Sequence, residues 1–330
     1  MMRKAKIQSI SYYLPEEILD NETLVKKFPN WTAEKIANKT GVKKRHIASS
    51  QEYASDLAYQ ACVKLFEAGA CSPKNIEFIL LCTQSPDYFL PTTACILQNR
   101  LGIPVTSGAL DFNLGCSGYI YGLSLAKGLI ESGQVSNVLL ITAETYSKYL
   151  NENDISTRAI FGDAAAATYI DLSLSSNVFE LSSFIFGTDG SGEENLILRE
   201  GASKLPSDNL RNLLMNGSEI FSFTIKMVPK AMESLLNKAE LNINEVDYFI
   251  FHQANEYMLT HLRDKINIPK DKFYINLESS GNTVSSSIPI ALKDALSKNF
   301  IKVSDKIALV GFGVGYSWGA CLLQFNESPK

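Results

Sequence analysis

An order of buried strands and helices that occurs twice is the feature that most limits how this chain can fold. Ile76–Cys82 and Val246–Phe251 are continuous apolar runs, which are typical of strands buried on both faces. Each run leads through a loop and a helix to a strand that ends in a polar turn, Leu110–Gly118 in one case and Phe273–Gly281 in the other. Strands that alternate with helices indicate a parallel sheet covered on both faces. We therefore predict an α/β protein built from two duplicated halves.

The chain length agrees with two halves. At 330 residues it exceeds what one ordinary hydrophobic core organises. We place the halves at residues 1–175 and 176–330, so that the first carries Cys116 and the second carries His252 and Asn282. The segment 187–216 is rich in Gly, Ser, Asn and Glu and has no counterpart in the first half. We expect it to form a surface excursion over a cleft.

Composition excludes several functional classes. A hydrophobic share of 45% and a charged share of 20% are those of a soluble globular protein, and no apolar run reaches membrane-spanning length. The net charge of -4 argues against a nucleic-acid partner. The N-terminus lacks the apolar core of a signal peptide, so we expect a cytoplasmic protein. Its six cysteines show no paired metal spacing, so we expect free thiols and no bound metal.

Asn113–Gly118 forms the most informative turn of the chain. It joins an apolar strand to a long apolar helix that runs to Glu131, and it places Cys116 at the mouth of that helix. Backbone amides and the helix dipole favour an anion there, which would lower the pKa of the thiol and make it a nucleophile. Most free cysteines are instead small buried apolar residues. On this segment alone the two interpretations are equal.

Two further polar residues follow predicted buried strands. His252 follows Val246–Phe251, and Asn282 follows the strand that begins at Phe273. Ligands bind at the carboxyl ends of strands in open α/β sheets, so packed halves would bring Cys116, His252 and Asn282 into one site. Taken singly, the histidine is a capping or core residue and the asparagine a turn residue.

The glycine-rich segment Gly311–Gly319 also has two interpretations. It can be a strand crowded against another backbone, which only glycine allows. It can equally free backbone amides to bind a ligand oxygen, as an oxyanion hole requires.

Together these motifs resemble the four active-site motifs of the β-ketoacyl-acyl-carrier-protein synthase III family, in the thiolase superfamily of condensing enzymes. The four are Asn113–Gly118, His252–Asn255, Gly281–Thr283 and Gly311–Gly319. Further matches are Lys39–Val42, Arg45–Ala48, Phe161–Ala164 and Met215–Glu219, so the resemblance covers essentially the whole chain. It implies a thiolase-like fold, layered as an α-β-α-β-α sandwich, and a homodimer.

The resemblance also implies an acyltransferase mechanism. Cys116 would accept an acyl group from acyl-CoA or an acyl-carrier protein, with the amides of Cys116 and Val314 as the oxyanion hole. His252 and Asn282 would then donate hydrogen bonds to a malonyl thioester during decarboxylative condensation. No cofactor is implied, because the thioesters are substrates. The implied substrate-binding residues are Leu90, Gly217, Asn255 and Phe312.

Other functions stay open at this point. A non-decarboxylating acyltransferase of the same fold would move the acyl group to a hydroxyl or an amine. It would keep Cys116 and His252, whereas Asn282 favours condensation because an enolate needs both donors. An inactive partner subunit would not need all three residues, and a Cys–His hydrolase would not explain the resemblance along the whole chain.

Several positions depart from the family pattern. The tryptophan and arginine that clamp the adenine of coenzyme A fall at Lys35 and near Ile155, and carrier-docking basic residues fall at Ser222 and Tyr257. A cation–aromatic sandwich cannot be built from Lys and Ile, so we expect weaker use of acetyl-CoA. Leu90 replaces a phenylalanine of the acyl pocket, and we expect a roomier pocket.

Overall fold

The computed structural model describes residues 3–172, 178–199, 201, 203–204 and 212–326. Its strands form two sets of five with one topology. The first set has the order β5-β4-β6-β7-β1 and consists of β1 (Lys6–Tyr13), β4 (Phe78–Cys82), β5 (Gly108–Phe112), β6 (Asn137–Glu144) and β7 (Ala164–Asp171). The second has the order β12-β11-β13-β14-β8 and consists of β8 (Val178–Thr188), β11 (Tyr248–Phe251), β12 (Phe273–Tyr274), β13 (Lys306–Gly313) and β14 (Ser317–Asn326). Numbered within each set, the two orders are the same. The predicted boundary at residues 175 and 176 lies outside the described residues.

The two sets meet edge to edge. Lys6 and Ile7 of β1 pair with Glu180 and Phe179 of β8, so the strands form one ten-stranded sheet instead of two separate ones. Within it, β4, β5 and β6 run parallel, as do β11, β12 and β13. The remaining pairs are antiparallel. Each half therefore has three neighbouring parallel strands whose carboxyl ends point the same way.

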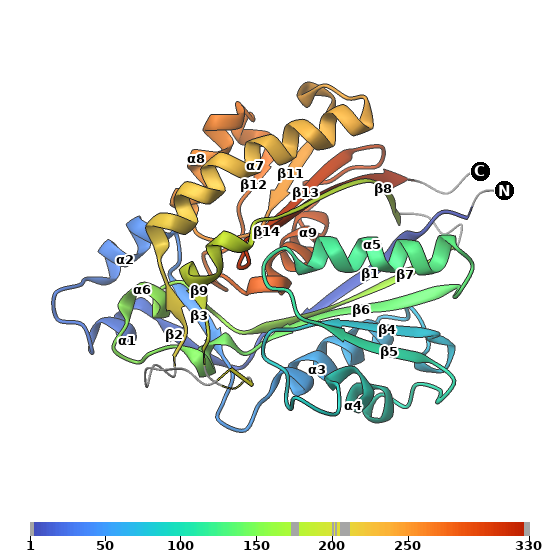
Figure 1. Cartoon of the computed structure of the whole chain (residues 1–330), viewed down its shortest axis with the longest axis horizontal. Coiled ribbons are helices and arrows are strands. Elements are labelled where there is room, and N and C mark those ends of the chain that lie inside the picture. The colour runs from blue at the N-terminus through green and yellow to red at the C-terminus, as the bar shows by residue number, and fades with distance from the viewer. Residues whose placement is uncertain (1–2, 173–177, 200, 202, 205–211, 327–330) are drawn as a thin grey trace.

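Helices cover both halves and also separate them (Figure 1). The outer layers are α3 (Ala54–Glu67) with α4 (Thr93–Arg100) on the first half, and α7 (Gly217–Ala239) with α8 (Glu256–Ile266) on the second. Between the halves lie α5 (Gly118–Glu131) and α9 (Ser287–Ser297). Each layer is held by a cluster of buried apolar side chains, and burial of such surface is the main stabilising force. The predicted thiolase-like α-β-α-β-α sandwich is confirmed.

The central helix α5 shows how the sequence produces this packing. Its buried side chains include Tyr119, Leu123, Ala126 and Ile130, which repeat at three or four residues and form one apolar face. That face and strand β6, which is buried along its whole length, belong to one core between the halves. The continuous apolar runs in the sequence are thus strands covered on both faces.

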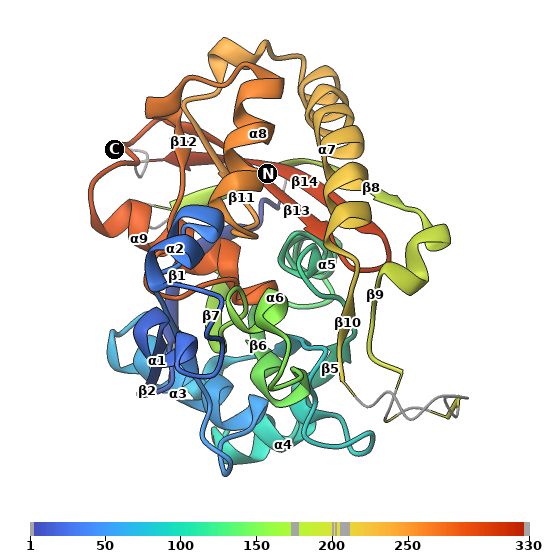
Figure 2. The same ribbon diagram turned by 90° about the vertical axis from the view of Figure 1, so that its left-hand side faces the viewer.

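Smaller elements gather at one end of the layers, at the left of Figure 1 and toward the viewer in Figure 2. They are β2 (Glu17–Asp20), α1 (Asn21–Val25), α2 (Ala33–Thr40), β3 (Lys44–Ile47), α6 (Ile155–Arg158), β9 (Leu196–Ile197) and β10 (Leu214–Met215). Strands β9 and β10 pair with each other and come from the segment 187–216. That segment is therefore not entirely irregular where the structure describes it.

Strand β12 is much shorter than expected. The sequence predicts a strand that begins at Phe273 and ends in a polar turn by Gly281, but only Phe273 and Tyr274 pair with β11. Beyond them the side chain of Gln253 replaces the missing strand neighbour: its Oε1 accepts from the Asn276 amide at 2.6 Å, and its Nε2 donates to the Tyr274 carbonyl at 3.4 Å. The chain is thereby free to turn toward the first half.

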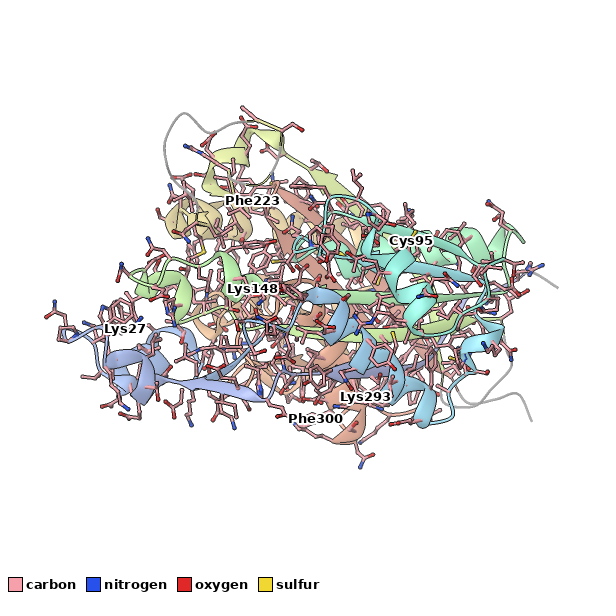
Figure 3. All side chains as sticks on the ribbon, turned by 90° about the horizontal axis from the view of Figure 1, so that it is seen from below. Lys27, Cys95, Lys148, Phe223, Lys293 and Phe300 are labelled. Atoms are coloured by element: carbon pink, nitrogen blue, oxygen red, sulfur yellow. The ribbon has the colours of Figure 1, made fainter. Side chains whose placement is uncertain are left out.

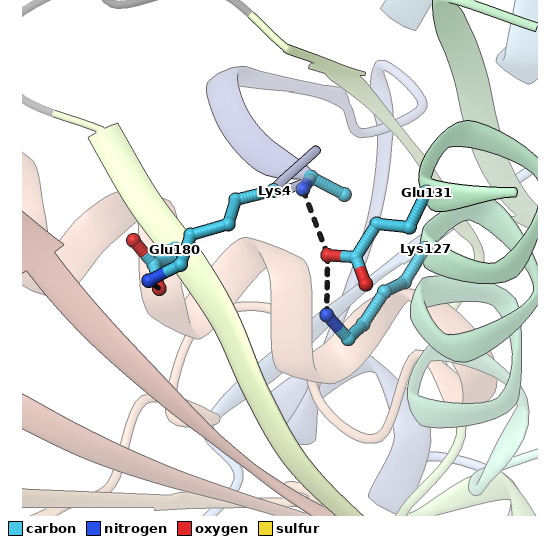
Figure 4. A network of polar contacts seen from close by, with 5 residues as sticks. Lys4, Lys127, Glu131 and Glu180 are labelled. Carbon is cyan, nitrogen blue, oxygen red and sulfur yellow. Dashed lines mark hydrogen bonds and ion pairs between the residues drawn. The ribbon is translucent and has the colours of Figure 1, made fainter. Parts of the chain in front are cut away.

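Polar contacts gather near the start of β1 (Figure 4), and one of them joins the two halves. Lys4 forms an ion pair with Glu180 of β8 at 2.5 Å. Glu131, at the end of α5, accepts from the Ala5 amide at 3.0 Å and also binds Lys127. Pairs this exposed contribute little to stability, so the apolar core is what holds the halves together.

The six cysteines are free thiols. Only Cys95 is exposed, on α4 in an outer layer, where Figure 3 labels it. Within the described residues, no helix combines the length and the apolar composition that a membrane span requires.

Candidate active site

The structure brings Cys116, His252 and Asn282 to the wall of one cavity of about 110 Å³. Cys116 comes four residues after β5, His252 directly after β11, and Asn282 after the loop that follows β12. All three strands end on this side of the sheet, so the parallel strand ends of the two halves supply one site. Residues that are far apart in sequence meet as the sequence predicts.

Cys116 sits on a tight turn against strand β13. The Gly115 carbonyl accepts from the Gly118 amide at 2.8 Å, and α5 begins there. A Cβ atom on Gly313 would lie 2.9 Å from the Cys116 Cβ and 3.0 Å from its Sγ, and one on Gly311 would lie 2.8 Å from the Cys116 carbonyl oxygen. These glycines therefore let β13 approach the nucleophile, which is the crowded-strand interpretation of the segment.

The expected low pKa of Cys116 is wrong for this structure. Burial raises the pKa of the thiol well above its usual value, and the charge of Glu144 raises it further. A backbone hydrogen bond at Cys116 acts in the opposite direction but is the smaller effect. The turn has the geometry for a thiolate, but desolvation outweighs it.

His252 is a neutral hydrogen-bond donor. Burial lowers its pKa to about 3, against which a backbone hydrogen bond with Val284 is a weaker effect. Its Nδ1 lies 2.7 Å from the Ser287 hydroxyl, whose oxygen also accepts from the Gln253 amide at 3.3 Å. In the tautomer that carries its proton on Nε2, the hydroxyl donates to Nδ1 and both contacts are satisfied.

Asn282 is held by the first half of the chain. Its amide donates to the Ile160 carbonyl at 2.9 Å, and its carbonyl accepts from the Gly162 amide at 3.0 Å. Its side-chain Oδ1 accepts from the Val284 amide at 2.9 Å. The Nδ2 group is therefore the part of this side chain that remains to donate.

Three consecutive serines fasten the turn after Asn282. The Ser285 hydroxyl donates to Glu144 at 2.8 Å, Ser286 lies 2.8 Å from the Thr142 hydroxyl, and Ser287 contacts His252. The turn is thus tied both to strand β6 and to His252.

Glu144 is a residue of the site that sequence reasoning missed. It ends strand β6, is completely buried, and accepts from the Gln84 amide at 3.0 Å and the Ser85 hydroxyl at 3.1 Å in addition to Ser285. Burial raises its pKa to about 8. The signal in the sequence was a single acidic residue at the end of a continuous apolar run.

The motifs at residues 45–48 and 161–164 contribute buried polar side chains that connect the segments around the site. Asp163 accepts from the Ala48 amide at 2.7 Å and from the Ser147 amide at 2.9 Å, and burial raises its pKa to about 6. Buried Arg45 donates to Asn21 at 2.7 Å and to the Ala159 carbonyl at 3.0 Å. Both residues hold chain segments together.

The remaining predicted residues divide between two cavities. Gly217, Asn255 and Phe312 line the cavity that holds Cys116. Leu90 and Val314 instead line a neighbouring cavity of about 770 Å³, and Leu90 is 83% exposed.

Two of these residues also have structural contacts. Asn255 caps α8 by accepting from the Met258 amide at 2.8 Å, and the Phe312 ring meets His252 edge to face at 5.5 Å.

An aromatic residue does lie beside Lys35. The Nζ atoms of Lys35 and Lys39 lie 4.6 and 5.1 Å from the centroid of the Trp31 ring. Trp31 also packs in the same apolar cluster as Ile155. Matching the sequence position by position missed this tryptophan because it lies four residues before Lys35, just ahead of helix α2.

The fold and the Cys-His-Asn cavity define a thiolase-like condensing enzyme, a class of acyltransferase. Comparison with known proteins gives the family. Residues 110–190 match the model of 3-oxoacyl-(acyl-carrier-protein) synthase III, and residues 236–325 match the model of its C-terminal part. The beta-ketoacyl-(acyl-carrier-protein) synthase III of Clostridioides difficile (strain 630) is 37% identical over 332 residues, with 99% of this chain and 100% of that protein covered.

Solved structures agree. A crystal structure of 3-oxoacyl-(acyl-carrier-protein) synthase III superposes with a TM-score of 0.94 at 46% identity, covering 98% of this chain and all of the other. The synthase III from Aquifex aeolicus VF5 gives 0.88 at 35% identity, covering 97% and 100%. The chain belongs to the 3-oxoacyl-(acyl-carrier-protein) synthase III family.

Proposed function

We propose that this condensing enzyme loads an acyl group on Cys116 and extends it with a malonyl thioester. The observation that carries the proposal is the single buried cavity lined by Cys116, His252 and Asn282. One residue supplies a nucleophile, and the other two supply hydrogen-bond donors that are already in position. Preorganised donors of this kind stabilise negative charge that develops on a substrate oxygen.

The first step transfers the acyl group. The Cys116 sulfur attacks the thioester carbon, the bond to the donor's sulfur breaks, and the donor thiol leaves with the proton given up by Cys116. Backbone amides of Cys116 and Val314 hold the oxyanion. Those amides also polarise the thioester carbonyl, which favours attack on it although burial raises the pKa of Cys116.

The second step forms a carbon–carbon bond. The malonyl thioester loses carbon dioxide, and its enolate oxygen accepts hydrogen bonds from His252 Nε2 and Asn282 Nδ2. The enolate carbon attacks the acyl carbon, the bond to Cys116 breaks, and the released thiolate takes up a proton. His252 suits this role because its low pKa keeps the ring neutral. A neutral ring can donate a hydrogen bond to the enolate oxygen, and decarboxylation needs no general base to remove a proton from the substrate.

Simple acyl transfer to a hydroxyl or an amine is not favoured. That reaction needs a nucleophile and a base, but it has no enolate for Asn282 to stabilise. The backbone bonds of Asn282 to Ile160 and Gly162 hold this residue at the cavity, and the bond from the Val284 amide to its Oδ1 orients the side chain. Condensation gives such a fixed donor a use, and simple acyl transfer does not.

The same proposal covers partners and compartment. We infer that the acyl donor is acyl-CoA or an acyl-carrier protein, that two copies form a homodimer with Leu90 at the partner's acyl pocket, that no cofactor takes part, and that the protein is cytoplasmic. The exposure of Tyr88, Phe89 and Leu90 on one loop supports the homodimer, because apolar side chains gathered in this way mark an interface. Sedimentation at micromolar concentration tests it, and a monomer would contradict it.

The test of the reaction is intact-mass spectrometry with a panel of acyl-CoA and acyl-carrier-protein donors, followed by malonyl-CoA or malonyl-carrier protein. We expect one acyl mass on the protein, which disappears on addition of the malonyl thioester as a 3-oxoacyl product is released. An acyl mass that is released to hydroxyl or amine acceptors but not to malonyl thioesters would instead support the simple acyltransferase.

A further inference from the structure

The site has a second, larger cavity that Cys116 does not line. Its volume is about 770 Å³, against about 110 Å³ for the cavity that holds Cys116. Many of its lining side chains are apolar, Leu198, Leu213 and Phe89 among them. Leu196 lines both cavities, so the two are neighbours. Such a space suits a hydrocarbon chain.

Tyr146 stands between the two cavities. It lines the larger one, is buried, and lies with its ring centroid 5.4 Å from that of Phe161, which lines the smaller one. It belongs to the short helix Tyr146–Tyr149 that directly follows β6. The ring pair Tyr146–Phe161, together with Leu196, therefore forms the partition.

A chain of hydrogen bonds holds Tyr146 in place. Its hydroxyl donates to Gln84 Oε1, and Gln84 Nε2 donates to Asn113 Oδ1 at 3.0 Å. The Gln84 backbone amide is itself bonded to Glu144 at 3.0 Å. These three residues lie at the ends of neighbouring strands: Gln84 follows β4, Asn113 follows β5 and Glu144 ends β6. The hydroxyl of Tyr146 is therefore held by a network that connects three strand ends. Moving it would leave a buried hydroxyl without a partner.

We propose that Tyr146, held by Gln84, is a specificity-determining residue that limits the length of the acyl group on Cys116. This inference rests on the proposed function. An acyl chain attached to Cys116 meets the partition before it reaches the larger cavity. The larger cavity is thus closed to Cys116 unless Tyr146 is displaced.

The experiment measures acylation of Cys116 by intact mass for straight-chain donors from acetyl-CoA to decanoyl-CoA. It compares the wild type with Tyr146→Ala and Tyr149→Ala. Tyr149 is the matched control: it belongs to the same short helix, lines the larger cavity and touches Tyr146 edge-on at 6.2 Å, but it is not part of the partition.

We expect Tyr146→Ala to raise the rate of decanoyl loading relative to acetyl loading by about tenfold or more, which is the discrimination that a single methylene gives in an apolar pocket. Tyr149→Ala should leave that ratio close to wild type. Equal shifts in both variants, or no shift in Tyr146→Ala, would overturn the proposal. If Tyr146→Ala does not fold, Tyr146→Leu replaces it, because leucine is shorter than tyrosine and cannot bond Gln84, so it opens part of the partition while it still fills the core; the same shift in the loading ratio is expected in this variant.

The readout separates this inference from the proposed function. A wild type that gains no acyl mass from any donor contradicts the function itself. A wild type that is acylated, with a length profile that Tyr146 does not change, contradicts only the partition.

Discussion

The two halves have the same strand order, yet their corresponding strand ends do different work. In the first half β5 leads within four residues to Cys116, and β6 ends at the buried acid Glu144. In the second half β12 leads through a longer loop to Asn282, and β13, which corresponds to β6, ends at Gly313. The backbone supplies two equivalent sets of strand ends. In the proposed reaction, the side chains there make one half the source of the nucleophile and the other half the source of the donors.

The contrast between Glu144 and Gly313 is the most informative part of this comparison. Gly313 has no side chain because the space beside it is taken by Cys116 of the other half. Glu144 fills its position and receives three hydrogen bonds, one of them from Ser285 of the other half. Each half therefore completes the other. Gly313 of the second half leaves room for Cys116 of the first, and Glu144 of the first half holds the turn at Ser285 of the second.

Removing the nucleophile should have the largest effect. Cys116→Ala should gain no acyl mass, because no other thiol lines this cavity among the described residues. Cys95→Ala is the control, since Cys95 is the exposed thiol, and it should be acylated as the wild type is. An acyl adduct that persists in Cys116→Ala would remove this residue from its role in the first half.

Removing the Asn282 side chain, a hydrogen-bond donor of the second half, should slow condensation but not acylation. Asn282→Ala should still be acylated, but condensation should slow by about 100- to 1000-fold, the typical cost of losing one preorganised donor. The malonyl-dependent release of the 3-oxoacyl product measures this. Asn276→Ala is the control in the same loop, because its side chain bonds Asp294 and does not line the cavity. Condensation near the wild-type rate in Asn282→Ala would contradict the enolate role.

Adding a methyl group at Gly313, the residue that ends β13 beside Cys116, should have a smaller effect on acylation. In Gly313→Ala the new Cβ would lie 2.9 Å from the Cys116 Cβ, so β13 or the Cys116 turn must shift. We expect acylation to slow by about tenfold or more, since a misplacement of 1 Å can cost about 100-fold. The control is Gly128→Ala on α5, where nothing lies within 4 Å. Equal acylation rates for the two variants would show that this contact does not position the nucleophile.

Much of this arrangement could be predicted from the sequence, for definite reasons. Buried strands such as β6 read as continuous apolar runs, and helices such as α9 repeat their apolar residues, so both follow from local pattern. The meeting of Cys116, His252 and Asn282 followed from the repeated order of elements, because parallel strand ends share one edge.

Other features depend on contacts between distant segments. The pKa of Cys116 rises because the packed halves exclude water, and no local pattern shows that. Strand β12 is short because Gln253, a residue of another segment, takes over its hydrogen bonds. Tyr146 and Glu144 likewise gain their roles only from the loops that fold against them.

The smallest effect concerns Glu144 and appears in stability. Burial raises the pKa of Glu144 from an ordinary 4.5 to about 8, so the folded chain binds this proton more tightly than the unfolded chain. Its contribution to stability is therefore complete below pH 4.5 and is lost as the pH rises through 8. In Glu144→Gln this loss cannot occur. The melting temperature of the variant, taken relative to wild type, should rise by a few degrees between pH 5 and pH 8.

The quantity to compare is how the melting temperature of the variant, relative to wild type, changes with pH, and not its value at any one pH. A glutamine amide would face the donors of Gln84, Ser85 and Ser285, which lowers the stability of the variant at every pH. His252 also titrates with a shifted pKa, but it does so in both proteins and cancels. The charge of Asp163 helps to raise the pKa of Glu144, so its effect is part of the slope that is measured. Glu152→Gln is the exposed control: Lys27 lowers the pKa of Glu152 below its ordinary 4.5, so this group stays ionised from pH 5 to pH 8 and its variant should show no slope there. Parallel melting curves for wild type and Glu144→Gln across this range would show that Glu144 is ionised when buried, and that its three donors outweigh desolvation where the two halves join.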